Sequence, residues 1–192
     1  MLSQLYLIRH GETAWSLTGQ HTGRTDVPLT DKGEQDARHL AGRLGAVKFD
    51  AVLTSPRRRA QRTCELAGLG EQAQVDTDLA EWDYGDYEGL RSVEIRQRHP
   101  GWNIYRDGCP HGELPVEVRD RADRLLVKLR ARDGAFAVFS HGHFGRVLAA
   151  RWIGAPLEEA QRFMLNPASV SLLAYEHDDP TAPVIALWNE TL

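Results

Sequence analysis

Short continuous apolar runs alternate along the chain with longer stretches in which an apolar residue recurs every three or four positions. The runs at residues 5–8, 51–54 and 135–139 are typical of strands that are buried on both faces of a sheet. The longer stretches predict amphipathic helices. These helices are expected at about residues 30–44, 56–67, 116–130 and 142–153.

Weaker patterns predict the remaining regular elements. Residues 74–76 fit a short edge strand, and residues 157–163 fit a short helix. Two terminal strands are expected at 169–175 and 184–188, on either side of a turn at 178–180. Strands and helices that alternate in this way predict an α/β sandwich on a mostly parallel sheet.

The regular pattern breaks between residues 81 and 115, where five glycines are interspersed with aromatic residues. We predict one short helix in this stretch, at residues 92–98. The stretch is interpreted as an excursion from a single domain spanning residues 1–192, rather than as an independent domain.

The composition is that of an ordinary globular protein. Of the 192 residues, 42% are hydrophobic and 26% are charged, and a domain of this size folds without needing disulfides or a metal. The formal net charge of −4 gives no indication of a nucleic-acid partner. Cys64 and Cys109 lack the spacing of a zinc site and favour a reducing compartment. With neither an export signal nor an apolar run long enough to span a membrane, we expect a cytoplasmic protein without a membrane partner.

Arginine and histidine residues follow all three buried runs. Arg9 and His10 follow the first, and residues 57–59 are three consecutive arginines just after the second. His141 follows the third, with His143 two positions further on. Because the carboxyl ends of parallel strands lie at one edge of a sheet, we expect these side chains to gather there beside helix N-termini. The cluster predicts a site for a dianion, most simply a phosphoryl group.

Each part of this cluster also has a purely structural interpretation. An arginine–histidine pair at 9–10 is often a solvated strand end, and a histidine in the position of His141 is often a buried residue with its hydrogen bonds satisfied. Three consecutive arginines usually form a charged helix face, from which at most one side chain points inward. The functional interpretation is favoured because all three features fall at the same edge of one sheet.

The order of several motifs resembles that of a known family. Residues 9–12, Arg-His-Gly-Glu, resemble the RHGE signature of the histidine phosphatase (phosphoglycerate mutase-like) superfamily, and the similarity continues in order through residues 21–30, 55–63, 81–89 and 140–142. Within that family, the chain most resembles the broad-specificity acid phosphatases and sugar bisphosphatases. The resemblance implies a three-layer sandwich whose mostly parallel central sheet has helices on both faces, with the site at the carboxyl ends of its strands.

The resemblance also implies a role for each residue of the catalytic set. His10 matches the nucleophile that becomes phosphohistidine, and Glu81 matches the general acid that protonates the leaving oxygen. Arg9, Arg59 and His141 match the cationic pocket around the phosphoryl group. The residues expected to bind the substrate are Ser16, Thr22, Gly23, Tyr84 and Gly142. The first three match positions near the bound phosphate, although Ser16 stands where many mutases of the family have asparagine.

These roles predict a phosphomonoesterase that needs no metal and no other cofactor. A neutral imidazole attacks without first losing a proton, and the eight histidines show no metal-binding spacing. Its partner is expected to be a small phosphorylated metabolite, and the sequence indicates no particular oligomeric state. A phosphoglycerate mutase is the first alternative. Mutases of the family carry a lysine shortly after the Gly-Leu pair, whereas here Gly89-Leu90 is followed by Arg91 and the lysine is absent. The second alternative is a non-catalytic phosphate-binding module, which the presence of both His10 and Glu81 disfavours.

The segment 102–113 is expected to overhang the phosphate site as a lid. Its aromatic residues, glycines and proline resemble the substrate-facing lids of phosphatases in this family. Arg106 and His111 are therefore candidates for contacting the part of the substrate that carries the phosphate.

Overall fold

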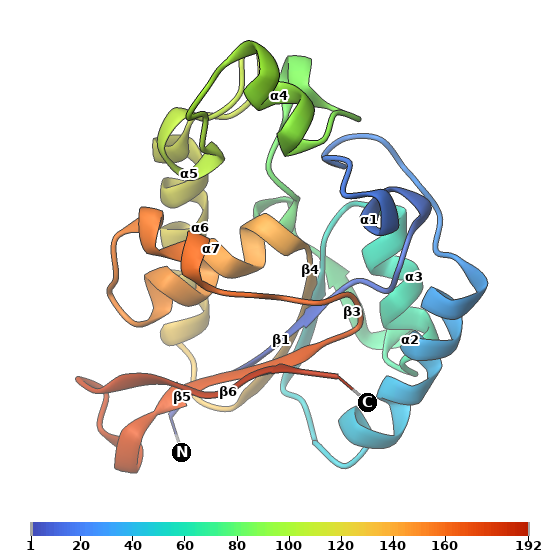
Figure 1. The fold of residues 1–192 in the computed structure, drawn as a ribbon. Coiled ribbons are helices and arrows are strands. Elements are labelled where there is room, and N and C mark those ends of the chain that lie inside the picture. The colour runs from blue at the N-terminus through green and yellow to red at the C-terminus, as the bar shows by residue number, and fades with distance from the viewer. Residues whose placement is uncertain (1, 192) are drawn as a thin grey trace.

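The structure is a computed structural model, which describes residues 2–191. Six strands form one sheet, and helices cover both of its faces (Figure 1). In chain order, the strands and α-helices are β1 (Gln4–Arg9), α1 (Ala14–Thr18), α2 (Asp31–Leu44), β2 (Ala51–Thr54), α3 (Arg58–Leu66), β3 (Ala73–Val75), α4 (Ser92–Arg98), α5 (Ile104–Asp107), α6 (Pro115–Arg130), β4 (Ala135–Ser140), α7 (Gly142–Trp152), β5 (Val170–Tyr175) and β6 (Pro183–Glu190).

The sheet has the strand order β3-β2-β4-β1-β5-β6. The first four of these strands are parallel, whereas β5 and β6 run antiparallel to their neighbours. The predicted three-layer α/β fold with a mostly parallel sheet is therefore confirmed. Because β1 and β4 are adjacent and parallel, the segments that follow them leave the sheet side by side.

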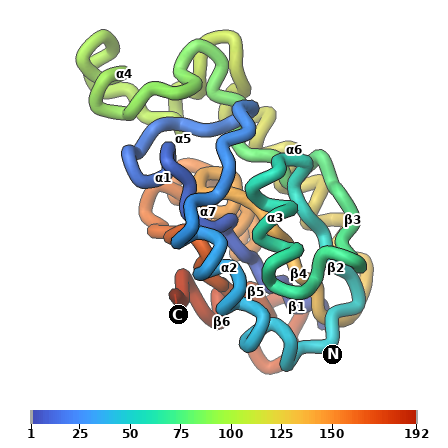
Figure 2. The backbone as a smooth tube through the Cα atoms, turned by 90° about the vertical axis from the view of Figure 1, so that its right-hand side faces the viewer, coloured from blue at the N-terminus to red at the C-terminus, as the bar shows by residue number. Residues whose placement is uncertain are grey.

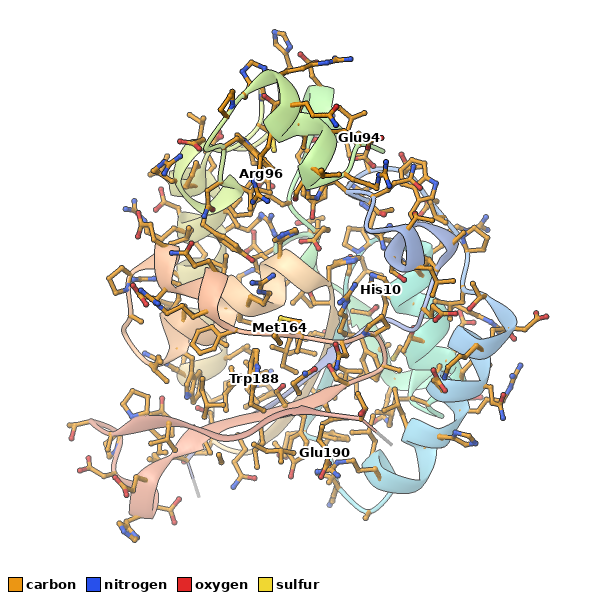
Figure 3. The ribbon with its side chains drawn as sticks, viewed as in Figure 1. His10, Glu94, Arg96, Met164, Trp188 and Glu190 are labelled. Carbon is orange, nitrogen blue, oxygen red and sulfur yellow. The ribbon has the colours of Figure 1, made fainter. Side chains whose placement is uncertain are left out.

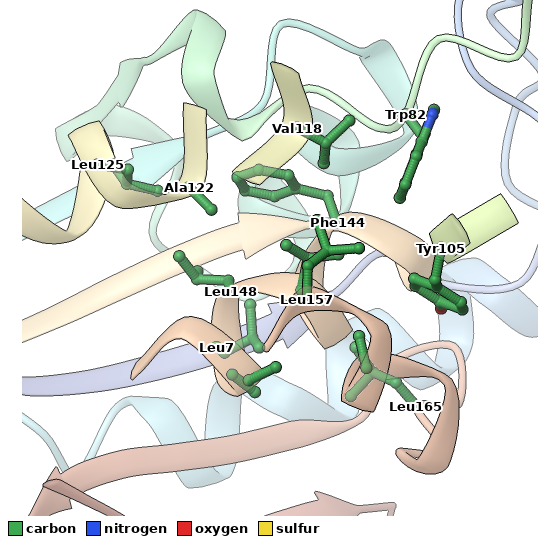
Figure 4. Packing of buried hydrophobic residues seen from close by; sticks show 14 of the residues in the cluster. Leu7, Trp82, Tyr105, Val118, Ala122, Leu125, Phe144, Leu148, Leu157 and Leu165 are labelled. Atoms are coloured by element: carbon green, nitrogen blue, oxygen red, sulfur yellow. The ribbon is translucent and has the colours of Figure 1, made fainter. Parts of the chain in front are cut away.

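Strand β4 shows why the central strands are apolar along their whole length. All six of its residues are buried. Phe136 and Val138 pack on the side of α6 and α7, whereas Ala137 and Phe139 pack on the side of α2 and α3. Figure 4 shows part of the first core, in which Phe144 of α7 and Val118 of α6 pack close together. A strand with a core on each face cannot alternate apolar and polar residues.

Three local elements differ from the sequence-based expectation. Residues 14–18 form a short helix that the hydrophobic pattern does not predict, because Thr13 and Ser16 cap each other's backbone. Helix α3 begins at Arg58 instead of Pro56, since the Ser55 hydroxyl accepts the Arg57 N–H and Arg57 stays extended. The segment Leu157–Arg162 is a 3₁₀-helix rather than an α-helix.

The excursion between residues 81 and 115 contains α4 where it was predicted and also α5, which was not predicted. Figures 1 and 2 place both helices at the same end of the molecule as α1, which follows the carboxyl end of β1. Among residues 2–191, no helix is long and apolar enough to cross a membrane.

Candidate active site

A cavity of about 210 Å³ opens at the carboxyl ends of β1 and β4. Its walls come from the loop after β1, the start of the excursion, the N-terminal end of α7 and the segment before β5. Seven of the ten predicted site residues line this cavity: Arg9, His10, Ser16, Thr22, Glu81, Tyr84 and Gly142.

His10 is held by the backbone directly after β1. Its N–H donates to the Ser140 carbonyl at 3.0 Å, and its own carbonyl accepts the Ala168 N–H at 3.1 Å. On the ring, Nδ1 lies 2.7 Å from the Gly11 carbonyl. A carbonyl oxygen only accepts, so Nδ1 carries the hydrogen and Nε2 keeps its lone pair. Figure 3 labels this side chain near the middle of the molecule.

The Nε2 atom of His10 is free to act as a nucleophile. It makes no hydrogen bond to any residue of the 2–191 range, and the side chain lines the cavity. Burial, together with the nearby Arg59 and Arg9 guanidinium groups, holds the pKa of His10 well below its usual range. The imidazole is therefore neutral at physiological pH, and the lone pair of Nε2 is available.

Two arginines, the half-buried Arg9 and the buried Arg59, lie near this histidine. Arg9 donates through Nη1 to the Leu165 carbonyl. Arg59 donates through Nη1 to the Thr25 carbonyl at 3.0 Å and through Nη2 to the Thr22 carbonyl at 2.7 Å. Burial lowers the pKa of both guanidinium groups, but arginine titrates so far above neutrality that both stay charged.

His141 lies next to His10, with the two ring centroids 5.2 Å apart. Its Nε2 lies 2.6 Å from the Ser55 hydroxyl. Burial, Arg59 and His10 itself hold the pKa of His141 well below its usual range, so this ring is neutral as well. Neither Arg59 nor His141 lines the cavity directly, and both lie buried behind it.

Each member of the predicted cationic pocket keeps one buried nitrogen without a partner. These atoms are Nε of Arg9, Nε of Arg59 and Nδ1 of His141. Buried polar groups in native proteins are nearly always hydrogen-bonded, so three such nitrogens around one histidine indicate a missing acceptor. An anion with several oxygens, such as a phosphoryl group, fits this need.

Glu81 connects the cavity to the N-terminal end of α7. Its Oε1 accepts the N–H groups of Trp82 and Phe144, both at 2.8 Å, and its Oε2 accepts the His143 N–H at 3.0 Å. The positive end of the helix dipole adds to these contacts. The carboxylate is thus fixed in one orientation at the cavity wall, where it can exchange a proton with a bound ester.

Of the predicted substrate-binding residues, only Gly23 lies away from the cavity. Its N–H donates to the Glu88 carboxylate at 2.9 Å, and a Cβ at this position would lie 2.5 Å from the Trp82 carbonyl oxygen. Close packing therefore accounts for this glycine. Ser16 lines the cavity, but its hydroxyl already donates to the Thr13 carbonyl at 2.9 Å.

Seven residues of the cavity wall were not among the predicted site residues, and three of these have charged or ionisable side chains. These three are His21, His143 and Arg146. The last two share the N-terminal part of α7 with Gly142, where polar residues interrupt an otherwise buried helix, and this interruption was a usable signal. His21 lies in a loop and offers no comparable signal.

The expectation for Arg106 and His111 is wrong. Neither lines the cavity, and both are exposed on the outer surface. Arg106 pairs with Asp107 at 2.7 Å and His111 lies 2.9 Å from Asp86, so the excursion turns these side chains outward.

The described residues include no group of three or more histidine, cysteine or acidic side chains arranged to hold a metal ion.

Comparison with known proteins points in the same direction. A family model described as the histidine phosphatase superfamily (branch 1) matches residues 5–191. An acid phosphatase of Mycobacterium tuberculosis (strain ATCC 25618 / H37Rv) is 44% identical over 190 residues, which cover 96% of this chain and 92% of the relative. A sedoheptulose 1,7-bisphosphatase of Saccharomyces cerevisiae (strain ATCC 204508 / S288c) is 32% identical over 213 residues, covering 94% of this chain and 77% of the relative. A solved structure of an open reading frame from Mycobacterium tuberculosis superposes with a TM-score of 0.90 at 42% identity, covering 98% of both chains.

Proposed function

This chain belongs to the histidine phosphatase superfamily, and we propose that it is a metal-independent phosphomonoesterase that hydrolyses small phosphorylated metabolites through a phosphohistidine on His10. One observation carries the proposal. His10, whose Nε2 is unbonded, lines the cavity together with Arg9, and buried nitrogens without acceptors are found on Arg9 and, behind the cavity wall, on Arg59 and His141. Such a pocket is complementary to the charge that spreads over the phosphoryl oxygens during transfer.

In the first step, the lone pair of His10 Nε2 forms a bond to phosphorus while the ester P–O bond breaks. The electron pair of that bond goes to the leaving oxygen, which takes a proton from Glu81. In the second step, Glu81 takes a proton from water as the water oxygen bonds to phosphorus. The N–P bond breaks, its electron pair returns to His10, and inorganic phosphate is released.

The named relatives, an acid phosphatase and a sugar bisphosphatase, support hydrolysis over isomerisation. A mutase must hold a phosphoglycerate carboxylate, for which mutases of the family use extra basic groups. Arg91 follows Gly89-Leu90, near the position of the mutase lysine, but it does not line the cavity, is exposed and pairs with Glu94 at 2.9 Å. It therefore adds no free cation to the cavity.

Both cysteines, Cys64 and Cys109, are buried and free. Burial raises the pKa of each thiol to about 12, which leaves both in the unreactive protonated form. Free thiols agree with a reducing compartment, and we retain the cytoplasm as the proposed location.

Trapping the intermediate tests the proposal. Brief reaction with ³²P-labelled phosphoester, followed by denaturation, should leave acid-labile and alkali-stable label on His10 of the native enzyme. His10→Ala should take up no label and show no turnover, while its circular dichroism spectrum matches that of the native chain. Label on serine or cysteine would refute the mechanism. Rapid isomerisation of 3-phosphoglycerate with little release of phosphate would instead make the enzyme a mutase.

A further inference from the structure

His143 lies in the cavity wall but has no part in the chemistry described above. Its backbone N–H donates to Glu81 Oε2 at 3.0 Å, so the residue is anchored directly beside the carboxylate that serves the leaving oxygen. Whatever the His143 side chain contacts therefore belongs to the leaving group, or lies close to it.

A hydrogen bond to Tyr84 determines which ring nitrogen of His143 carries the hydrogen. The Tyr84 hydroxyl lies 2.6 Å from His143 Nδ1, which is its one hydrogen-bond partner within residues 2–191. Tyr84 is 1% exposed, so its hydroxyl hydrogen has no water to bond and needs this nitrogen as acceptor. Nδ1 then carries the lone pair and Nε2 carries the hydrogen. Burial lowers the pKa of His143 and raises that of Tyr84, which keeps both groups neutral.

The remaining nitrogen of His143 is a free donor. Nε2 has no hydrogen-bond partner in the described part of the chain, and it is not among the buried atoms that lack one. The atom therefore keeps access to solvent, and the residue lines the cavity. The rings of His21 and Tyr105 pack against the imidazole, each with its centroid 5.5 Å away, and restrict its rotation.

We propose that His143 is a specificity-determining residue, whose Nε2–H donates a hydrogen bond to a hydroxyl oxygen close to the ester bond of the substrate. Tyr84 is the positioning residue that fixes the required tautomer. A neutral N–H donor that lies among aromatic rings is better suited to bind a neutral hydroxyl than a second anionic group. The preferred substrates are then phosphate esters of polyols, including sugar phosphates, rather than simple alkyl or aryl phosphates. This inference rests on the proposed phosphatase function.

A matched pair of esters tests the inference. Glycerol 1-phosphate and propyl phosphate have the same carbon skeleton and differ only in two hydroxyl groups. The native enzyme should prefer glycerol 1-phosphate by about tenfold or more in kcat/KM, as expected when a donor that the bound substrate covers goes unpaired with the other ester. His143→Phe should bring the ratio of the two kcat/KM values close to one. A loss of activity that affects both esters equally does not change this ratio.

Two further variants separate a hydrogen bond from a packing effect. His143→Gln places an amide N–H near the position of Nε2 and should restore most of the preference that His143→Phe removes. Tyr84→Phe keeps the imidazole but no longer holds it in one tautomer, so the preference for glycerol 1-phosphate should fall. In ¹⁵N NMR spectra of histidine-labelled protein, His143 should appear as the Nε2–H tautomer in the native chain and as a mixture in Tyr84→Phe.

The outcomes distinguish this inference from the proposed function. If the native enzyme hydrolyses both esters equally well, or if His143→Phe leaves the ratio unchanged, the role of His143 is refuted while the phosphatase function stands. A native His143 found as the Nδ1–H tautomer also refutes it. If neither ester is hydrolysed and no phosphohistidine forms, the proposed function fails and the inference fails with it.

Discussion

A single glutamate, Glu81, links proton transfer to the backbone of a helix. Three N–H groups bind its carboxylate, and two of them belong to the first turn of α7. The same α7 turn carries Gly142 and His143, which line the cavity. The proposed proton donor and the proposed hydroxyl contact are therefore both positioned by one helix end.

Replacing Glu81 by glutamine should slow esters with poor leaving groups most. An alkoxide needs a proton as it departs, whereas p-nitrophenolate is stable without one. Relative to the native enzyme, kcat/KM for glycerol 1-phosphate should fall about 100-fold further than kcat/KM for p-nitrophenyl phosphate. Equal slowing of the two substrates would remove Glu81 from the role of general acid.

The sequence predicts that Arg9, His10 and His141 lie close together because they follow strand ends. Each comes within two positions of the end of a continuous apolar run, so topology alone brings them together. The role of His143 depends instead on a hydrogen bond to Tyr84, a residue 59 positions away. A contact of that kind has no periodic signature in the sequence.

At the scale of elements, the first turn of α2 supports the loop that carries His10. Gly11 and Gly33 meet there with their backbones in contact, since a Cβ on Gly11 would lie 2.5 Å from the Gly33 carbonyl oxygen. A Cβ on Gly33 would lie 2.2 Å from the Glu12 carbonyl oxygen. Neither position has room for a side chain, so the helix and the loop fix each other's position.

Two alanine substitutions in α2 should therefore have opposite effects on stability. Gly42→Ala meets no atom within 4 Å and should stabilise the protein by roughly 0.5–1 kcal/mol, the usual gain for glycine replaced inside a helix. Gly33→Ala forces backbone apart and should destabilise it by about 2 kcal/mol. Urea denaturation measures both, and Gly33→Ala should also lower kcat because the loop after His10 moves. A stabilising Gly33→Ala would contradict the close contact.

The excursion at 81–115 marks the limit of what the hydrophobic pattern predicts. Helix α4 was predicted at its observed bounds, whereas α5 has only four residues and shows no periodicity. The outward placement of Arg106 depends on its ion pair with Asp107, and that of His111 depends on its contact with Asp86. Such pairs between short, exposed segments leave no pattern in the chain.

At the scale of the whole molecule, the catalytic end of the sheet concentrates neutral histidines. His10, His21, His141 and His143 all have a lowered pKa, and for each the largest cause is burial. The pKa of His21 falls to about 4. Neutral His10 remains a nucleophile in mildly acidic solution, so the chemistry itself does not require neutral pH. The fold, however, is exposed to acid through the same four groups.

Stability should fall as the pH drops below about 6.5. The unfolded chain binds protons on these histidines near their ordinary pKa of about 6.5, whereas the folded chain does not until the pH is much lower. At a pH between the lowered pKa of the folded chain and the ordinary pKa of about 6.5, the unfolded state therefore binds more protons than the folded state. The free energy of unfolding is therefore greatest above pH 6.5 and declines with acid, by up to about 1.4 kcal/mol per pH unit for each histidine. Urea titrations at pH 7, 6 and 5 measure the slope.

His21→Phe keeps an aromatic ring against Tyr84 but removes one titrating group, so its slope should be shallower by about that amount between pH 6.5 and pH 4. If native and His21→Phe proteins lose stability in parallel across this range, the acid sensitivity does not arise from the buried histidine at position 21.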